Sequence, residues 1–176
     1  MNLANKITMA RLFLVPICVL ILLINNQPAK IISVVIFILA CLTDALDGYV
    51  ARKKNLITDF GKFMDPLVDK LLVSSVLIAL VDLKKISCWV AIIIIWRELI
   101  ITGFRLCAVN KNIVIAANKL GKIKTVSQMI MIIIIMLDLK VIFMIGLKYL
   151  FIFLALVFSI WSGIDYIYKN KEVLKD

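Results

Sequence analysis

Long apolar runs dominate this 176-residue chain and leave little room for a soluble fold. Hydrophobic residues make up 64% of the sequence, whereas soluble domains usually contain roughly 45–50%. A membrane-spanning helix needs about 20 mostly apolar residues, and six such runs can be placed: 8–26, 29–51, 64–82, 86–106, 123–138 and 141–167. The runs are continuous rather than alternating, so they favour helices over a β-barrel. We therefore predict an all-α integral membrane protein, a bundle of six transmembrane helices forming a single domain over residues 1–176.

Charge differs between the loops that would lie on opposite sides of the membrane. Lysine and arginine gather at the N-terminus, near residues 52–62 and 105–124, and in the C-terminal tail. The opposite loops hold mainly Lys30, Lys84, Lys85 and Lys140, with Asp82 and Asp138 among them. The positive-inside rule then predicts a multi-pass cell-membrane protein with both termini in the cytoplasm. The net charge of +10 fits contact with anionic membrane phospholipids, and it equally fits simple topological bias.

The scarce acidic residues gather where the second apolar run meets the third. The chain has 11 acidic residues against 21 basic ones, and five fall in this one stretch: Asp44, Asp47, Asp59, Asp65 and Asp69. Asp44 and Asp47 share one helical face, as do Asp65 and Asp69. The polar linker 53–62 contains Gly61 and is expected to turn the chain, with Pro66 in the first turn of the next helix. Four carboxylates would then face one another at the membrane surface.

Clustered carboxylates repel one another unless cations neutralise them, and at membrane depth such groups tend to be functional. The chain has no histidine. Its cysteines are spaced like small core residues rather than zinc ligands: Cys18, Cys41, Cys88 and Cys107. An all-oxygen site suits Mg²⁺ or Mn²⁺, and two such ions can clamp a phosphoryl group and its leaving group. The alternative is a set of solvated helix caps, which two spaced pairs with intervening glycines disfavour.

The aspartates belong to a longer pattern with fixed small and basic positions: Asp44-x-x-Asp47-Gly48-x-x-Ala51-Arg52, then after eight residues Gly61-x-x-x-Asp65-x-x-x-Asp69. This pattern resembles the complete signature of the CDP-alcohol phosphotransferases. The resemblance implies a six-span membrane enzyme, commonly a homodimer, with its active site at the cytoplasmic side. Together with the spacing, it assigns two Mg²⁺ or Mn²⁺ ions to the four signature aspartates. It also points to Asp69 as the catalytic base.

For the donor, the resemblance implies a mixed set of polar and small residues around CDP-diacylglycerol: Asn5, Thr8, Asp47, Gly48, Ala51, Arg52, Thr58 and Gly61. Arg52 would hold the diphosphate, and Thr58 would donate a hydrogen bond. The small residues would make room for the nucleotide, although small residues also allow close helix packing in membranes. The diacyl chains can stay in the bilayer, which suits a reaction at the membrane surface.

Further segments resemble the family's phosphatidylglycerophosphate synthases: "NLANKITMARLFLVP", "WRELIITGFRLCAVNKN", "KLGKIKTVSQM" and "SGIDYI". The resemblance implies transfer of the phosphatidyl group from CDP-diacylglycerol to sn-glycerol 3-phosphate, with release of CMP. The residues expected at the acceptor phosphate are Arg11, Arg97, Arg105, Lys122, Lys124 and Gln128. Arginine binds phosphate bidentately, whereas lysine supplies a point charge. Topological charge bias and snorkelling are the alternative explanation, and Arg97 can instead pair with Glu98 or with a neighbour on another span.

Two other functions stay open at this point. The same chemistry can use another acceptor, as in cardiolipin, phosphatidylinositol-phosphate or phosphatidylserine synthases. A small cation transporter would use the carboxylates as an ion path, but such a path needs acids near the middle of the membrane. No nucleic-acid partner is expected.

Overall fold

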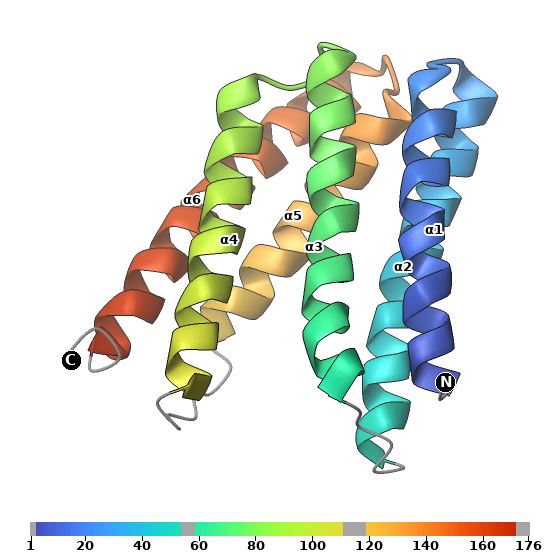
Figure 1. Cartoon of the computed structure of the whole chain (residues 1–176). Helices are drawn as coiled ribbons and strands as arrows, with labels where there is room; N and C mark the ends of the chain where they lie inside the picture. The colour runs from blue at the N-terminus through green and yellow to red at the C-terminus, as the bar shows by residue number, and fades with distance from the viewer. Residues whose placement is uncertain (1–2, 54–58, 111–118, 172–176) are drawn as a thin grey trace. The chain divides into compact units, whose positions relative to one another are not determined.

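The computed structural model describes the backbone of residues 3–53, 59–110 and 119–171, and the side chains of residues 8–43, 67–68, 70–108 and 120–171. The described chain is built from helices (Figure 1): α1 (Leu3–Leu23), α2 (Gln27–Lys53), α3 (Asp59–Asp82), α4 (Cys88–Asn110), α5 (Lys119–Leu137) and α6 (Ile142–Lys169). Each helix contains most of one predicted apolar run. The all-helical prediction is therefore confirmed.

Several helices continue past the apolar runs into polar sequence. Helix α2 reaches Lys53 and α3 already begins at Asp59, so the connection between them falls within 54–58, outside the described residues. Gly61 therefore lies in α3 rather than in a turn, and Pro66 lies inside α3 rather than in its first turn. The predicted positions of Gly61 and Pro66 were therefore wrong, although the connection falls within the predicted linker 53–62. Hydropathy marks the part of a helix that suits the hydrocarbon core, and a polar helix can continue beyond that core.

The chain divides into two compact units. Unit 1 comprises Met1–Lys85 with Met136–Asp138, and unit 2 comprises Ile86–Ile135 with Leu139–Asp176. In unit 1, α1 packs against both α2 and α3. Figure 1 shows that, within unit 1, α1 begins at the end where α2 finishes and α3 starts. In unit 2, α4 packs against α6.

The core of unit 1 is formed by apolar side chains of its three long helices: Val15, Leu22, Val34, Phe37, Ala40, Val68, Leu72, Val76 and Leu77. Two reciprocal hydrogen bonds join α1 to α2. The Cys18 thiol donates to the Ser33 carbonyl oxygen at 3.5 Å, and the Ser33 hydroxyl donates to the Cys18 carbonyl oxygen at 3.3 Å. Small side chains at this crossing let the two backbones approach, as is common between helices in membranes.

An ion-pair group, the Asp138 cluster (Lys30, Lys85 and Asp138), joins the start of α2 to the segments that follow α3 and α5 in unit 1. Asp138 Oδ2 accepts hydrogen bonds from Lys30 Nζ at 2.9 Å and from Lys85 Nζ at 2.5 Å. Helix α5 ends at Leu137, so Asp138 lies just outside the helix rather than in the predicted span. The start of α2 and the segments after α3 and α5 therefore meet at one end of unit 1, as the charge pattern predicts.

Left-handed backbone follows three of the helices. Asn25, Lys84 and Asp138 have φ of 58°, 55° and 48°, and each lies just after α1, α3 or α5. At the end of α3, Lys84 N donates to the Val81 carbonyl and Lys85 N donates to the Leu80 carbonyl, both at 2.9 Å. These are the two hydrogen bonds of a Schellman motif, which usually places glycine at the left-handed position. The motif turns the chain and directs Lys85 to Asp138.

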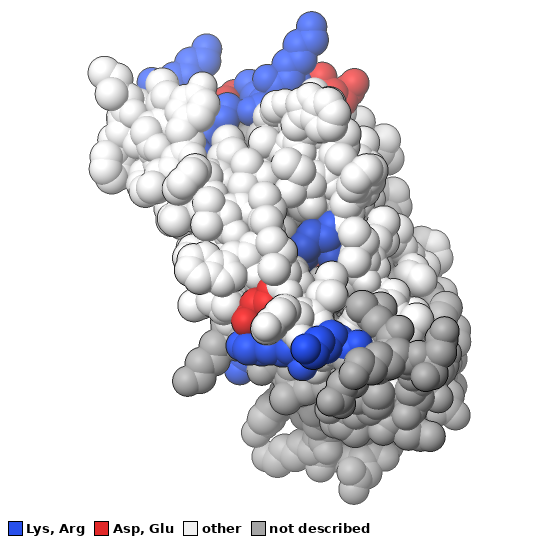
Figure 2. All heavy atoms as spheres, turned by 90° about the vertical axis from the view of Figure 1, so that its left-hand side faces the viewer, with Lys and Arg blue, Asp and Glu red and all other residues white. Residues whose placement is uncertain are grey.

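Helix α6 in unit 2 separates a small, partly polar face from a large apolar one. Its buried residues are Ala155, Ser159, Ser162, Gly163 and Tyr166. Its exposed apolar residues include Ile142, Phe143, Phe153, Trp161 and Ile164. Figure 2 shows a largely uncharged face, with charged side chains gathered near its two ends and one small basic patch between them. Two described helices, Leu120–Leu137 and Ile142–Lys169, are long and apolar enough to cross a membrane.

The four cysteines are all free, but they do not share one environment. Cys18 is buried and Cys41 is half-buried, as expected of small core residues. Cys88 and Cys107 are exposed, so the core assignment was wrong for these two. An apolar outer surface, such as the one on α6, accepts a cysteine as readily as a core does, and composition alone does not separate the two environments.

Candidate active site

The signature aspartates lie on two contacting helices of unit 1. Helix α2 carries Asp44 and Asp47, and α3 carries Asp65 and Asp69. The two helices run in opposite directions (Figure 1). Because both backbones are helical here, separations of three and four residues place each pair on one helical face. The four side chains lie outside the described residues, so the facing arrangement of the two pairs stays a prediction.

The other residues predicted around the donor divide in the same way. Side chains outside the described set are those of Asn5, Gly48, Ala51, Arg52, Thr58 and Gly61. Thr8 and Arg11 are described. They lie three residues apart on α1, and they are only 2% and 1% exposed. Burial of polar and charged side chains requires polar partners, so the interior of unit 1 is polar on this part of α1.

Among the described side chains, no group of three or more His, Cys, Asp or Glu residues is placed to hold a metal ion. The predicted ligands, Asp44, Asp47, Asp65 and Asp69, all lie outside that set. Their oxygen donors and helical spacing remain compatible with a hard divalent cation.

Unit 2 contains a second polar group, which we call the arginine cluster (Arg97, Glu98, Arg105, Lys124, Ser162 and Tyr166). Arg97 of α4 donates from Nη2 to the Ser162 hydroxyl of α6 at 2.9 Å, and its Nη1 lies 3.6 Å from Glu98 Oε2. Lys124 of α5 is only 1% exposed and forms a salt bridge with Glu98. Glu98 is therefore shared between two cations, and the predicted pairing of Arg97 with Glu98 is confirmed as a long contact.

Arg105 lies two helical turns beyond Arg97 on α4. Its Nε donates to the Tyr166 hydroxyl at 3.0 Å, and its Cζ lies 5.4 Å from the centre of the Tyr166 ring. The Tyr166 ring is buried and packs edge-on against Phe104, with 5.9 Å between ring centres. Arg105 is itself exposed. A rigid, buried tyrosine therefore anchors one edge of a guanidinium that other molecules can reach.

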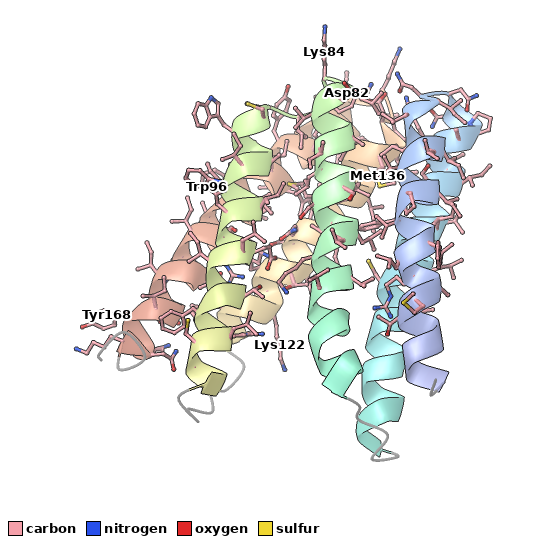
Figure 3. All side chains as sticks on the ribbon, viewed as in Figure 1. Asp82, Lys84, Trp96, Lys122, Met136 and Tyr168 are labelled. Carbon is pink, nitrogen blue, oxygen red and sulfur yellow. The ribbon has the colours of Figure 1, made fainter. Side chains whose placement is uncertain are left out.

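The remaining predicted phosphate residues differ from one another. Lys122 is exposed, and its side chain points away from α5 (Figure 3). Gln128 is buried, and among the described residues its Oε1 has no hydrogen-bond partner. Arg97 Nε is in the same situation. Buried polar atoms are rarely left unpaired in native proteins, so these two atoms are suited to a ligand or ordered water. The structure thus brings Arg97, Arg105 and Lys124 into one group and leaves Lys122 on the surface.

Sequence reasoning did not assign Ser162 and Tyr166, the α6 residues that hold the two arginines. The available signal was the segment "SGIDYI", whose similarity to relatives is visible but whose partners are not. Chemically, the arginine cluster holds three cations and one carboxylate, and its two hydroxyl groups are neutral. It therefore keeps a positive charge suited to an anion such as a phosphate ester.

These observations define a class: a helical, membrane-associated protein with an aspartate motif on two helices and a basic group suited to phosphate. Comparison with known proteins gives the family. The sequence profile described as CDP-alcohol phosphatidyltransferase matches residues 1–161. The chain belongs to this family, whose members are membrane-bound.

Relatives with assigned names are similar over most of the chain. A Bacillus subtilis (strain 168) protein named CDP-diacylglycerol–glycerol-3-phosphate 3-phosphatidyltransferase is 42% identical over 99% of this chain and 97% of its own length. A Rickettsia typhi protein of the same name is 38% identical over 79% of this chain and 78% of its own length. A Mycobacterium tuberculosis protein named probable phosphatidylglycerophosphate synthase is 41% identical over 72% of this chain and 62% of its own length.

Proposed function

We propose that this chain transfers the phosphatidyl group from CDP-diacylglycerol to sn-glycerol 3-phosphate in phospholipid biosynthesis, forming phosphatidylglycerophosphate and releasing CMP. The observation that carries this proposal is the near full-length similarity to a Bacillus subtilis protein whose name states that reaction, at 42% identity. The arginine cluster adds support of a different kind. Glycerol 3-phosphate brings a dianionic phosphate, and arginine and lysine side chains bind such a group through charge-assisted hydrogen bonds.

The donor and two Mg²⁺ or Mn²⁺ ions are assigned to unit 1. The backbone is helical through the signature, so α2 and α3 each offer two carboxylates from one face. This donor set fits a hard divalent cation, and the proposed ligands are Asp44, Asp47, Asp65 and Asp69. When bound, two such ions supply charge neutralisation for the diphosphate and for the departing CMP.

The remaining donor residues would shape the nucleotide site. Arg52 holds the diphosphate and Thr58 donates a hydrogen bond, while Asn5 and Thr8 line the site from α1. The small residues Gly48, Ala51 and Gly61 leave room for the base and phosphates. A leucine at position 48 would fill that room, so Gly48→Leu is expected to raise KM for CDP-diacylglycerol while the protein still folds.

In the proposed reaction, the acceptor hydroxyl oxygen attacks the phosphorus on the lipid side of the diphosphate. A new P–O bond forms as the bond to the CMP oxygen breaks, and CMP leaves with the electron pair. Asp69 takes the proton from the attacking hydroxyl. Aspartate is a weak base in water, with a reference pKa of about 3.9, but a positioned base still contributes about 10²–10⁴ in rate.

The acceptor phosphate is assigned to the arginine cluster. Arg97, Arg105 and Lys124 supply the charge, and Gln128 offers a buried carbonyl oxygen that lacks a partner among the described residues. Arg11 on α1 and the exposed Lys122 complete the predicted set.

The organisation of the protein in the cell is also a proposal. We expect a single domain over residues 1–176 with six membrane spans, both termini and the active site at the cytoplasmic side of the cell membrane, and a homodimer. Single-cysteine variants Pro28→Cys and Glu172→Cys, in a background without the four native cysteines, test the topology. An impermeant reagent should label position 28 in intact cells and position 172 only after lysis. Labelling of both positions in intact cells would contradict it.

The acceptor is tested by incubating the purified protein with CDP-diacylglycerol and each candidate in turn. sn-Glycerol 3-phosphate should give metal-dependent CMP release, whereas phosphatidylglycerol, inositol phosphate and serine should not. Preference for one of these three would retain the chemistry and change the acceptor. Ion flux in vesicles without CMP release would instead indicate a transporter.

The catalytic assignment is tested with a matched pair of aspartates. Asp69→Asn should lower kcat by at least about 10²–10⁴, with affinity for CDP-diacylglycerol within a few-fold of wild type. Asp59→Asn is the control, because Asp59 lies at the start of α3 outside the signature spacing. If Asp69→Asn remains active and Asp59→Asn is inactive, the base has been assigned wrongly.

A further inference from the structure

The segment Ser162-Gly163-Ile164-Asp165-Tyr166 of α6 has no role in the function proposed above. Three of its residues, Ser162, Gly163 and Tyr166, belong to the buried face of the helix. The segment begins immediately after residue 161, where the match to the family profile ends. Helix α6 packs against α4, the helix that carries Arg97 and Arg105.

Ser162 and Gly163 together hold Arg97. The Ser162 hydroxyl donates its proton to the Ser159 carbonyl oxygen at 3.2 Å and accepts a hydrogen bond from Arg97 Nη2 at 2.9 Å. The first bond orients the hydroxyl, so its lone pair points to the guanidinium. A Cβ atom at Gly163 would lie 3.4 Å from Arg97 Cγ, and glycine thus leaves space for the arginine stem.

Tyr166 holds Arg105 in a comparable way. Its hydroxyl accepts a hydrogen bond from Arg105 Nε at 3.0 Å. The tyrosine is 3% exposed and its ring packs edge-on against Phe104, so the hydroxyl has a fixed position. Among the described residues, this hydroxyl is the one hydrogen-bond partner of the Arg105 side chain.

Both hydroxyl partners are neutral, so they leave the charge of the arginines in place, and Arg97 has only a long 3.6 Å contact with the Glu98 carboxylate. A guanidinium has five N–H donors, and each arginine gives one to its hydroxyl partner. The two arginines lie two helical turns apart on α4, and their hydroxyl partners lie four residues apart on α6. An anion that binds there takes up the remaining donors, and a phosphate can do so bidentately.

We infer that Ser162, Gly163 and Tyr166 are positioning residues that hold Arg97 and Arg105 in the orientation that binds the phosphate of the acceptor. The inference rests on the proposed function for the identity of that acceptor. It assigns α6 a role in acceptor affinity, separate from the aspartate motif that serves the donor and the chemical step.

The experiment uses full-length Tyr166→Phe and Ser162→Ala proteins in detergent micelles with CDP-diacylglycerol. Each variant removes one hydroxyl that accepts a hydrogen bond from a charged donor, so KM for glycerol 3-phosphate should rise about tenfold. The value of kcat and KM for CDP-diacylglycerol should stay within about threefold of wild type, because donor and base residues are unchanged. The constant for competitive inhibition by inorganic phosphate should rise in parallel with KM.

Matched controls lie on the same helix. Tyr168→Phe also removes a tyrosine hydroxyl, but Tyr168 is exposed and points away from α6 (Figure 3). Ser159→Ala removes a buried hydroxyl that has no hydrogen-bond partner among the described residues. Gly163→Ala should raise the acceptor KM, whereas Gly146→Ala should not, because a Cβ atom at Gly146 meets nothing within 4 Å.

A binding measurement separates this inference from the proposed function. Calorimetric titration with glycerol 3-phosphate, without donor, should show weaker binding by Tyr166→Phe and Ser162→Ala than by wild type and the controls. If the variants bind glycerol 3-phosphate more weakly than wild type does, but wild type does not convert it, the proposed function is rejected and the inference is kept. Unchanged binding and KM in folded variants would overturn the inference, as would an equal rise in KM for both substrates.

Discussion

The Asp138 cluster of unit 1 and the arginine cluster of unit 2 both hold several cations, but the cations have different partners in the two clusters. Lys30 and Lys85 both donate to the carboxylate of Asp138, at 2.9 and 2.5 Å. Arg97 and Arg105 donate to the hydroxyl groups of Ser162 and Tyr166, at 2.9 and 3.0 Å. A carboxylate cancels charge, whereas a hydroxyl fixes orientation and leaves the charge in place.

This difference separates a structural role from a binding role. The Asp138 cluster joins the start of α2 to the segments after α3 and α5, and its two lysines and one carboxylate keep a formal charge of only +1, against +2 for the arginine cluster. The arginine cluster is oriented but not neutralised, and Glu98 is already shared with Lys124. Arg97 is only partly exposed and Arg105 is accessible to other molecules, and their charge-assisted donors suit an anion, so the cluster is expected to serve a ligand. Substitutions in the Asp138 cluster should therefore change stability, and substitutions in the arginine cluster should change acceptor binding.

The largest effect is expected from removal of a guanidinium. Arg105→Ala should raise KM for glycerol 3-phosphate about 100-fold, a loss of about 2.7 kcal/mol in acceptor binding. Arg105→Lys should recover only part of the loss, because lysine cannot bind phosphate bidentately. Steady-state kinetics with saturating CDP-diacylglycerol measure the change. Lys85→Ala is the control from the other cluster, and an equal rise in KM there would remove the distinction between the two.

The next effect is on stability. Asp138→Asn leaves Lys30, which is 8% exposed, without its carboxylate. Removing one partner of a fully buried ion pair costs about 3–5 kcal/mol, and partial exposure of Asp138 reduces the expected loss to about 1–3 kcal/mol. Thermal unfolding in detergent should show a lower Tm, with the acceptor KM unchanged. Asp82→Asn, at the exposed last residue of α3, should leave Tm unchanged.

The stability contributed by the Asp138 ion pairs should also depend on pH. Burial raises the pKa of Asp138, but hydrogen bonds and charges from Lys85 and Lys30 outweigh burial and hold that pKa below its ordinary value. A carboxylate with a lowered folded-state pKa contributes stability above its unfolded pKa of about 3.9 and loses it as the pH falls through the folded value. Wild type should therefore lose its Tm advantage over Asp138→Asn below about pH 4. A constant difference down to pH 2 would contradict the ion-pair assignment.

The smallest effect is expected at Lys122. Its side chain is exposed and points away from α5, so its charge is screened by water and salt. Lys122→Ala should change the acceptor KM by less than about twofold, within the range of an exposed ionic contact. A rise as large as that of Arg105→Ala would show that phosphate binding extends beyond the arginine cluster.

Several features of this protein follow from local sequence alone. Apolar runs predicted six helices because a membrane demands about 20 apolar residues per span. The aspartate motif could be recognised from the sequence because each of its two pairs lies within one helix. In a helix, residues three or four positions apart share one face. The alternation of loop charges placed Lys30, Lys85 and Asp138 at one end. These properties depend on residues that are close together along the chain, so they can be predicted from the sequence.

Other features required the tertiary structure, because they depend on partners distant in the chain. Arg97 and Ser162 are 65 residues apart, and Arg105 and Tyr166 are 61 apart. No periodicity connects such positions, and the predicted pairing of Arg97 with Glu98 did not reveal the serine on α6. The sequence likewise grouped five cations together at the acceptor phosphate. Packing made Lys124 a buried partner of Glu98, left Lys122 exposed and placed two arginines against neutral hydroxyl groups. The charge of a side chain can be read from the sequence, but the partner that offsets this charge is decided by the tertiary structure.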